Sequence, residues 1–436
     1  MTGSLGRVRV RWWIFTYMFL FAMFSYIERT SIGVASTSIR PALHLSNLQI
    51  GFLEWSFIIT YTVMQLPAGT FGQRYGARLT YVLVGIVGFI ATVATPLAPL
   101  LLSGLALFVL LAASQAMLGI SQAPVFPVFA GVVEPWFPSR QWSFANGLQS
   151  SGMTLGTAIT PPVLAYLTEW AGWQEALFIV AIPGLLMTLL WGWYGRNTPR
   201  EHPAVTEAEL AELGAVADEP RPPLTIARLL RIAGDRNVLL LAFSYMCMNY
   251  VFYLLTYWVY VYLTDHRHMT AVGGAWMAAI PPVGAAIGSA VGGMLSDWTA
   301  QRFGVRRGYH FVPMVSLPLA GLLLLVAIHV DTPIAAVAAL ALAFAGAEIT
   351  EGPYWAATTQ VARADTMAAT GVLNTGGNVG GLITIPIVAY LADRGAWDLA
   401  FVIGTGFAVV AALTWLAIDP SQRAQLDARV DPQTAS

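Results

Sequence analysis

GLQSSGMTLGTAITPPVLAYLTEWAGW, at residues 147–173, recurs 224 positions later as GVLNTGGNVGGLITIPIVAYLADRGAW, at residues 371–397. Gly, Pro, Tyr and Trp residues occupy matching positions in the two copies, and most other residues are apolar or small. The same offset pairs Gly69 with Gly293. One register kept without a gap over distant segments predicts that the chain consists of two copies of one structural unit.

The composition predicts that both copies are embedded in lipid. The chain has 436 residues, of which 57% are hydrophobic and 10% charged, whereas soluble domains carry roughly 25% charged residues. Stretches of the roughly 20 apolar residues that cross a bilayer as a helix recur along most of the chain. We expect twelve spans, at about 12–38, 50–72, 79–95, 100–133, 143–168, 174–195, 237–264, 272–296, 310–330, 333–360, 367–392 and 396–418.

The arginines predict the orientation of these spans. The chain has no lysine, and its 22 arginines are distributed unevenly. Twelve spans place both termini on one side, and eighteen arginines then fall on that side. Three fall on the other, Arg40, Arg267 and Arg394, and Arg29 lies inside a span. Because arginine-rich loops stay in the cytoplasm, both termini are expected there, in a bacterial inner membrane.

The expected fold is an all-α membrane protein with twelve helices in two pseudo-symmetric six-helix bundles. The bundles are expected at residues 1–195 and 237–418, followed by a cytoplasmic tail at 419–436. The long polar segment at 196–236 has too few apolar residues for a core of its own, so we interpret it as a cytoplasmic linker. Carriers with two parallel repeats bind substrate between them near the bilayer midplane, and the repeats rock around that site.

Four charged residues lie well inside the expected spans: Glu28, Arg29, Glu348 and Glu351. Each costs about 2.5–3.5 kcal/mol at membrane depth, so each needs a partner, water or a function. The guanidinium of Arg29 offers a planar fork to a carboxylate and stays charged, which predicts an anion-binding role. The alternative is an arginine paired permanently with an internal acid.

Glu28 precedes Arg29 and lies about 100° away from it round a helix. An acid that is alternately wetted and dried as the repeats rock is suited to take up and release a proton. The alternative for Glu28 is a fixed salt bridge.

Two related loops carry a recognisable motif. GTFGQRYGAR, at residues 69–78, resembles the loop between the second and third helices of the major facilitator superfamily, whose pattern is G-x-x-x-D-R-x-G-x-R. The matching residues are Gly69, Arg74, Gly76 and Arg78. Gln73 replaces the usual Asp, whereas the repeat copy, GGMLSDWTAQRFGVRR at 292–307, keeps the acid as Asp297. The resemblance implies a conformational latch between helices, weakened at Gln73.

Within that superfamily, further stretches resemble the anion:cation symporter family, which includes bacterial hexuronate and galactonate carriers and animal sialin and vesicular glutamate carriers. They are YIERTSIGVA (26–35), YTVMQLPAG (61–69), QAPVFPVF and WFPSRQWSFANGLQSSG (within 122–152), GPYWA (352–356) and NTGGNVGG (374–381). The resemblance covers nearly the whole chain apart from the linker and the tails.

That family pattern implies a proton-carrying acid on the first helix, an adjacent arginine that binds the substrate carboxylate, and a second acid on the fourth helix. Glu28 and Arg29 match the first two, and Gln122 stands at the third position. Aligning QAPVF with EGPYW, with one short gap, places Gln122 on Glu351. The missing acid is therefore expected on the tenth helix, with Glu348 one turn earlier. Alternatively, this pair of acids caps backbone groups or binds an arginine.

Uncharged candidates for substrate binding are Tyr26, Tyr61, Tyr253, Tyr354, Asn374 and Asn378. The tyrosines fall on spans expected to face a central cavity, although tyrosines in spans are more often packing or interfacial residues. The two asparagines lie one turn apart and can hydrogen-bond hydroxyl groups or a carboxylate.

Together these features predict a proton-coupled symporter of a small organic anion, a monocarboxylate such as a sugar acid or an aromatic acid. A proton antiporter or exporter of the same fold is the main alternative, and a non-transporting membrane sensor is a minor one. No Ser/His/Asp set, phosphate loop or Cys/His cluster in the sequence supports an enzyme, a cofactor or a metal. The expected partners are the anion, protons and the bilayer, with no nucleic acid, and the chain is expected to be a monomer.

Overall fold

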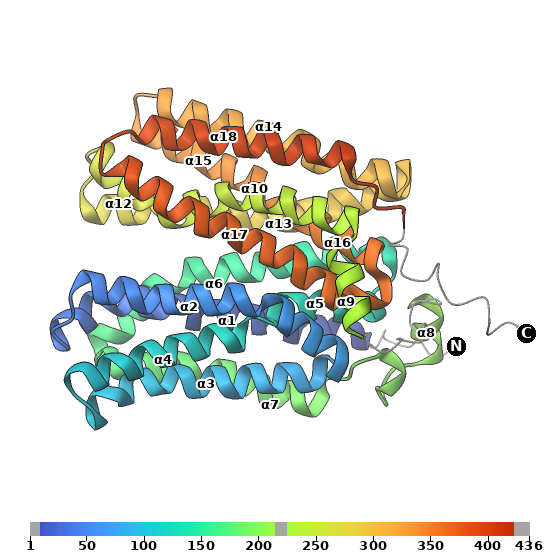
Figure 1. Cartoon of the computed structure of the whole chain (residues 1–436), viewed down its shortest axis with the longest axis horizontal. Helices are drawn as coiled ribbons and strands as arrows, with labels where there is room; N and C mark the ends of the chain where they lie inside the picture. Colours follow the sequence, from blue (N-terminus) through green and yellow to red (C-terminus); the bar gives the residue numbers. More distant parts are fainter. Residues whose placement is uncertain (1–8, 214–224, 423–436) are drawn as a thin grey trace, which may run out of the picture.

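The computed structural model describes residues 9–213 and 225–422, which are helical and contain no strand. Six rods form the first bundle: α1 (Val10–Ala42), α2 (Asn47–Tyr75), α3 (Ala77–Leu101), α4 (Gly104–Gln122) continued by α5 (Val125–Trp136), α6 (Trp142–Ala171) and α7 (Trp173–Tyr194). Six more form the second: α10 (Arg236–Tyr257), α13 (Ile280–Phe303), α14 (Val305–His329), α15 (Pro333–Glu348) continued by α16 (Glu351–Ala362), α17 (Thr366–Ala392) and α18 (Trp397–Thr414). Figure 1 shows the two bundles side by side, the first in blue and green and the second in yellow to red.

Shorter elements connect these rods. The helices among them are α8 (Glu207–Leu213), α9 (Ile226–Ala233), α11 (Val259–Val261) and α12 (Ala271–Ala278). Single turns of 3-10 or π type stand at Ser139–Gln141, Pro199–Glu201, Tyr262–His266, Arg363–Asp365 and Trp415–Ala417.

The twelve rods are the twelve membrane passes, and their polarity differs. Nine stretches of the described residues are long and apolar enough to cross a bilayer, and one of them, 333–392, contains two passes. The other two passes are α2 and α6, which are long enough, at 29 and 30 residues, but carry more polar groups. Both helices face the partner bundle, where polar side chains can find partners within the protein.

Two of the expected spans are broken near their middle. The span expected at 100–133 divides into α4 and α5 at Ala123 and Pro124, and that expected at 333–360 divides into α15 and α16 just before Glu351. Proline explains both breaks. Pro124 and Pro353 have no N–H to donate to the carbonyl group four residues earlier, so the regular helix stops there.

Both ends of the described chain lie at one end of the bundles. α1 begins and α18 ends there, and we call this end the terminal face and the opposite end the far face (Figure 1). The short helix α8 is fastened to it, because the Glu209 carboxylate accepts hydrogen bonds from the N–H groups of Val10 and Arg11, at 3.3 and 3.1 Å. Glu212 pairs with Arg9 and Arg11. Partial burial raises the pKa of Glu212, but the hydrogen bonds from these arginines outweigh burial and hold that pKa below its usual value.

The bundles meet mainly along two helix pairs, α2 with α17 and α6 with α13, and α16 also contacts α6 while α17 contacts α5. Glycines stand where the backbones approach most closely. A Cβ added to Gly69 would lie 3.3 Å from the Cα of Gly371, and one added to Gly147 would lie 3.2 Å from the Cα of Gly293. The 224-residue offset relates Gly69 to Gly293 and Gly147 to Gly371. The two contacts are therefore symmetry mates, and small residues at both allow close packing.

Candidate transport site

A small cavity lies between the bundles, with a volume of about 30 Å³. This is room for about two water molecules, so a larger solute would need the side chains or the bundles to move. Seven of the residues expected in the site line it: Tyr26, Arg29, Tyr61, Tyr253, Glu351, Asn374 and Asn378. The other lining residues are Phe126, Met153, Tyr245, Asn249, Phe252 and Trp355.

Arg29 is held in this cavity by aromatic groups. Its Nη1 donates to the hydroxyl of Tyr26 at 2.9 Å. Its guanidinium carbon lies 5.0, 4.9 and 4.6 Å from the ring centroids of Tyr26, Phe57 and Tyr61, which is cation–π distance. No carboxylate of the described residues forms an ion pair with Arg29. Its positive charge is therefore stabilised by ring faces, and no acid of the described chain neutralises it.

Glu28 lies outside this cavity, inside the first bundle. It lines a separate pocket of about 10 Å³, together with Thr92 and Thr95 of α3 and Gln115 of α4. The Gln122 side chain hydrogen-bonds the Glu28 carboxyl and also donates to the Ser25 carbonyl at 3.1 Å. The adjacent positions Glu28 and Arg29 thus point into two different spaces, as the 100° step of a helix requires.

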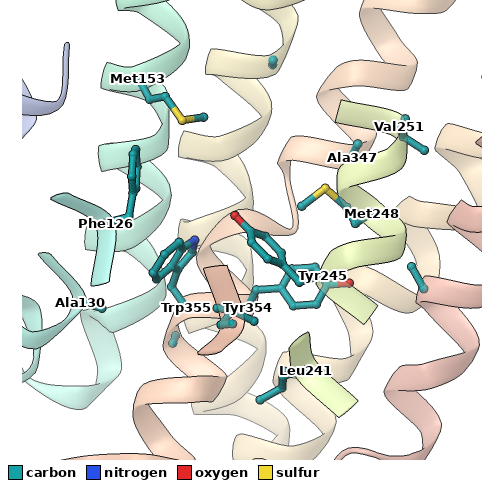
Figure 2. Close-up of a cluster of buried hydrophobic side chains, with 14 of the residues drawn as sticks. Phe126, Ala130, Met153, Leu241, Tyr245, Met248, Val251, Ala347, Tyr354 and Trp355 are labelled. Carbon is teal, nitrogen blue, oxygen red and sulfur yellow. The ribbon is translucent and has the colours of Figure 1, made fainter. Parts of the chain in front are cut away.

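Glu351 joins the two bundles within the central cavity. Its Oε2 accepts hydrogen bonds from the Trp355 indole at 2.8 Å and from the Tyr245 hydroxyl at 3.2 Å, both in the second bundle. A third comes from the Ser150 hydroxyl of α6 in the first bundle, at 3.2 Å. Figure 2 shows Trp355 between Phe126 of α5 and Tyr245 of α10. Movement of one bundle away from the other would therefore break a bond to this acid.

Glu348 and Tyr354 lie behind the cavity wall, inside the second bundle. Glu348 is 0% exposed, and its Oε2 accepts from the Ser289 hydroxyl at 2.9 Å. The Tyr354 hydroxyl shares a 2.6 Å hydrogen bond with Ser244, and its ring packs against Trp415. Neither residue lines the central cavity in this conformation.

The two asparagines of α17 form a hydrogen-bonded chain that reaches the first bundle. Asn378 accepts from the Tyr253 hydroxyl at 2.9 Å and donates to the Asn374 carbonyl at 2.7 Å. The Asn374 amide donates to Gln65 Oε1 of α2 at 2.9 Å. Sequence reasoning did not select Gln65, although a buried glutamine in an apolar span is itself a signal.

The motif loops place side chains across the terminal face. Asp297 of α13 accepts from the backbone N–H groups of Ser143 and Phe144, at 3.2 and 2.8 Å, and so caps the start of α6. Gln73 of α2 accepts from the Met367 N–H at 3.2 Å, at the start of α17, and donates to the Ala364 carbonyl. The repeat offset relates Gln73 to Asp297 and Ser143 to Met367, so these are two copies of one contact.

The other motif residues act within or beside the first bundle. Gly76 has φ 85° and separates α2 from α3. The Arg78 N–H donates to Asn197, and its guanidinium donates twice to the Gly192 carbonyl of α7, at 2.6 and 3.1 Å. Gly69 packs on α17, and Arg74 lies exposed over the Tyr75 ring.

Two repeated six-helix bundles, crossing the membrane around a polar cavity and capped against each other at one face, define a two-domain membrane carrier. The chain belongs to the Major Facilitator Superfamily, whose family model matches residues 18–380. It is a transporter and not an enzyme.

Similar proteins support this assignment along the whole chain. The sequence is 30% identical to a probable sulfoacetate transporter of Cupriavidus necator, SauU, with 95% of each chain covered. It is 27% identical to a hexuronate transporter of Bacillus subtilis, with 92% of each covered. Among solved structures, the proton:xylose symporter XylE matches with a TM-score of 0.77 at 15% identity, covering 96% of this chain and 98% of that one. The predicted fold and family resemblance are thereby confirmed.

We expect Asp297→Asn to loosen the terminal face, because the Ser143 and Phe144 N–H groups donate to different oxygens of Asp297 and an amide has only one acceptor oxygen. The loss of one hydrogen bond, about 0.5–1.5 kcal/mol, would raise the ratio of open to closed molecules roughly two- to twelvefold. Spin labels on cysteines introduced at the exposed Trp193 and Phe303 would report this as a larger long-distance population. The control is Asp398→Asn, an exposed acid in the first turn of α18. Unchanged distances in the Asp297 variant would contradict the latch.

Proposed function

We propose that the chain imports a small organic anion together with protons, by exposing the central cavity alternately to the two sides of the membrane. The observation that carries this proposal is Arg29, a cation at membrane depth with no ion-paired acid among the described residues. An anionic substrate supplies the missing charge, and a guanidinium fork is suited to a carboxylate.

The remaining cavity wall supports a substrate with one carboxylate and hydroxyl groups. Asn374, Asn378 and Tyr253 offer amide and hydroxyl groups for hydrogen bonds. Phe126 and Trp355 offer ring faces, on which the C–H face of a sugar acid or an aromatic ring can pack. Relatives named as hexuronate, D-galactonate and galactarate/D-glucarate transporters agree with a sugar acid. A monocarboxylate fits better than a dicarboxylate, because Arg29 is the one cation that lines the cavity among the described residues.

Charge balance in the cavity supports coupling to protons. Arg29 and Glu351 line the same space, so an anion bound at Arg29 would be repelled by an ionised Glu351. A proton on Glu351 removes this repulsion, and proton and anion therefore favour each other's binding. We assign a second proton to Glu28, whose pocket adjoins the same helix, α1, on the other side from Arg29. Glu348, enclosed one turn before Glu351, has a supporting role.

The distribution of the arginines is our basis for assigning the cytoplasmic face. Fourteen of the 18 arginines among the described residues lie on the side of the terminal face, which supports a cytoplasmic terminal face. With α2 packed on α17 and α6 on α13, and with both caps in place, we assign this conformation to the state closed toward the cytoplasm. We also propose bundles at 1–195 and 237–418, joined by the linker.

The proposal as a whole is tested by uptake into proteoliposomes with an imposed pH gradient. A panel of labelled organic acids should include sugar monocarboxylates, their dicarboxylate counterparts and aromatic acids. We expect accumulation of a monocarboxylate that collapses with a protonophore. Accumulation insensitive to the pH gradient would contradict proton coupling, and transport of cations alone would contradict the role of Arg29.

Arg29→Lys should lower uptake by about tenfold or more while the protein still folds, because a point ammonium cannot reproduce the planar fork or its stacking on Tyr61. The measurement is the initial rate of uptake, divided by the amount of folded protein that size-exclusion chromatography detects. Wild-type rates in the lysine variant would show that Arg29 does not clamp the carboxylate.

Glu28→Gln should abolish accumulation against a gradient and retain exchange of labelled for unlabelled substrate. The amide is the neutral isostere of the protonated acid, so the carrier can still rock but cannot release the proton. Counterflow and gradient-driven uptake are compared in the same liposomes. Thr80→Val on α3 is a control outside the Glu28 pocket. Undiminished accumulation would exclude Glu28 as a coupling site.

Glu351→Gln should lower the proton-to-substrate ratio or change the pH dependence of uptake, because it removes the titrating group that shares the cavity with Arg29. Glu348→Gln should have the smaller effect, since Glu348 does not line that cavity. Gln122→Glu is expected to rescue Glu351→Gln in part. The proton-to-substrate ratio is measured from reversal potentials. An unchanged ratio and an unchanged pH profile would show that Glu351 has only a structural role.

A further inference from the structure

The linker helix α9 leaves apolar side chains uncovered at the terminal face. Ile226 is 79% exposed and Leu230 is 67% exposed, although α9 lies outside the membrane passes. On the opposite side of the helix, the Arg228 guanidinium forms a salt bridge with the Asp365 carboxylate, with hydrogen bonds of 2.7 and 2.9 Å. Because Asp365 immediately precedes α17, this contact fixes α9 to the second bundle.

A groove separates α9 from the end of α2, which belongs to the first bundle. Its volume is about 280 Å³, far larger than that of the central cavity. Phe71 and Tyr75 of α2 form one wall, and Ile226 and Leu229 of α9 form the other. The groove is therefore mainly apolar, and it is open to the surroundings of the protein.

Arg74 brings a positive charge to this groove. Arg74 lines it, is exposed, and has its guanidinium carbon 5.3 Å from the Tyr75 ring centroid. No acid of the described chain forms an ion pair with Arg74. An apolar groove beside an unpaired guanidinium matches a ligand that has both a hydrocarbon chain and an anionic head.

The groove is continuous with the surface that α2 presents to lipid. Val63, Pro67 and Arg74 are all exposed, and their spacing of four and seven residues places them on one helix face. Val63 is within the membrane pass, and Arg74 is in its last turn, at the depth of lipid headgroups. A lipid chain can therefore enter the groove along α2 from the bilayer.

We propose that this groove binds an anionic phospholipid, with an acyl chain between Phe71 and Leu229 and its phosphate on Arg74. Basic groups beside a membrane surface each attract anionic headgroups by about 1 kcal/mol, which corresponds to about fivefold in affinity. The apolar walls favour a lipid over free phosphate, because phosphate would leave them exposed to water.

The bound lipid would hold the terminal face closed. One wall of the groove moves with the first bundle, and the other is tied to the second through Arg228 and Asp365. Separation of α2 from α17 would part the two walls and release the lipid. Anionic lipid is thus a ligand of the closed state, whatever solute the carrier transports.

Native mass spectrometry of the purified full chain, titrated with phosphatidylglycerol or phosphatidylcholine, tests the proposal. We expect wild type to retain phosphatidylglycerol at least about fivefold more tightly, and Arg74→Gln to remove this preference. The matched control is Arg302→Gln. Arg302 is also exposed at the end of a helix, stacks on Trp298 at 6.0 Å, and does not line the groove. Leu229→Ser should weaken both lipids.

Three outcomes would overturn the proposal. Equal phosphatidylglycerol affinity in wild type and Arg74→Gln would remove Arg74 from the site. An equal loss in Arg302→Gln would indicate general surface charge. Displacement of phosphatidylglycerol by millimolar inorganic phosphate would indicate a phosphate site without a lipid chain. Melting curves of each variant without added lipid verify that it is folded.

Discussion

Arg29 is a cation at membrane depth with no ion-paired acid among the described residues, and the groups around it are arranged to stabilise its charge. Arg29 cannot lose its charge, and the lipid around the bundles cannot solvate it. Three aromatic rings and several phenol hydroxyl groups stabilise this charge without an ion-paired acid among the described residues, and for this reason we propose the space beside it as the anion site. Glu351, in the same space, is held by donors from both bundles. Under the proposed function, the charge of the substrate, Arg29 and Glu351 would interact electrostatically within one cavity that both bundles line.

The internal repeat explains how the two bundles pack against each other. The positions at which the two copies differ include the charged residues of the candidate site. The close contacts Gly69 to Gly371 and Gly147 to Gly293 are exchanged by the 224-residue offset. The same offset relates Arg29 to Tyr253 and Glu28 to Phe252, so only the first copy carries charge at these two positions. Packing depends on both copies alike, whereas a substrate without internal symmetry needs different groups on its two sides.

Composition, span length and the repeat were sufficient to predict twelve membrane passes in two related bundles. Arg29 could be selected because a charge in an apolar span needs an explanation. Whether a side chain points into its own bundle or toward the other bundle was harder to predict. Helical periodicity shows which residues share a helix face, but it does not show which element covers that face. Glu28 and Tyr354 turn into the interior of their own bundles, and Gln65 reaches across to Asn374.

The two caps of the terminal face occupy equivalent positions but differ in the backbone groups that they bind. The Asp297 carboxyl group accepts from two N–H groups at the α6 edge, whereas the Gln73 amide accepts from one at the α17 edge and donates to a carbonyl group. Capping an N–H group at a helix start contributes about 0.5–2 kcal/mol. The seam between the bundles therefore has a strong side and a weak side. A rocking motion that starts from this state would separate α2 from α17 before it separates α6 from α13.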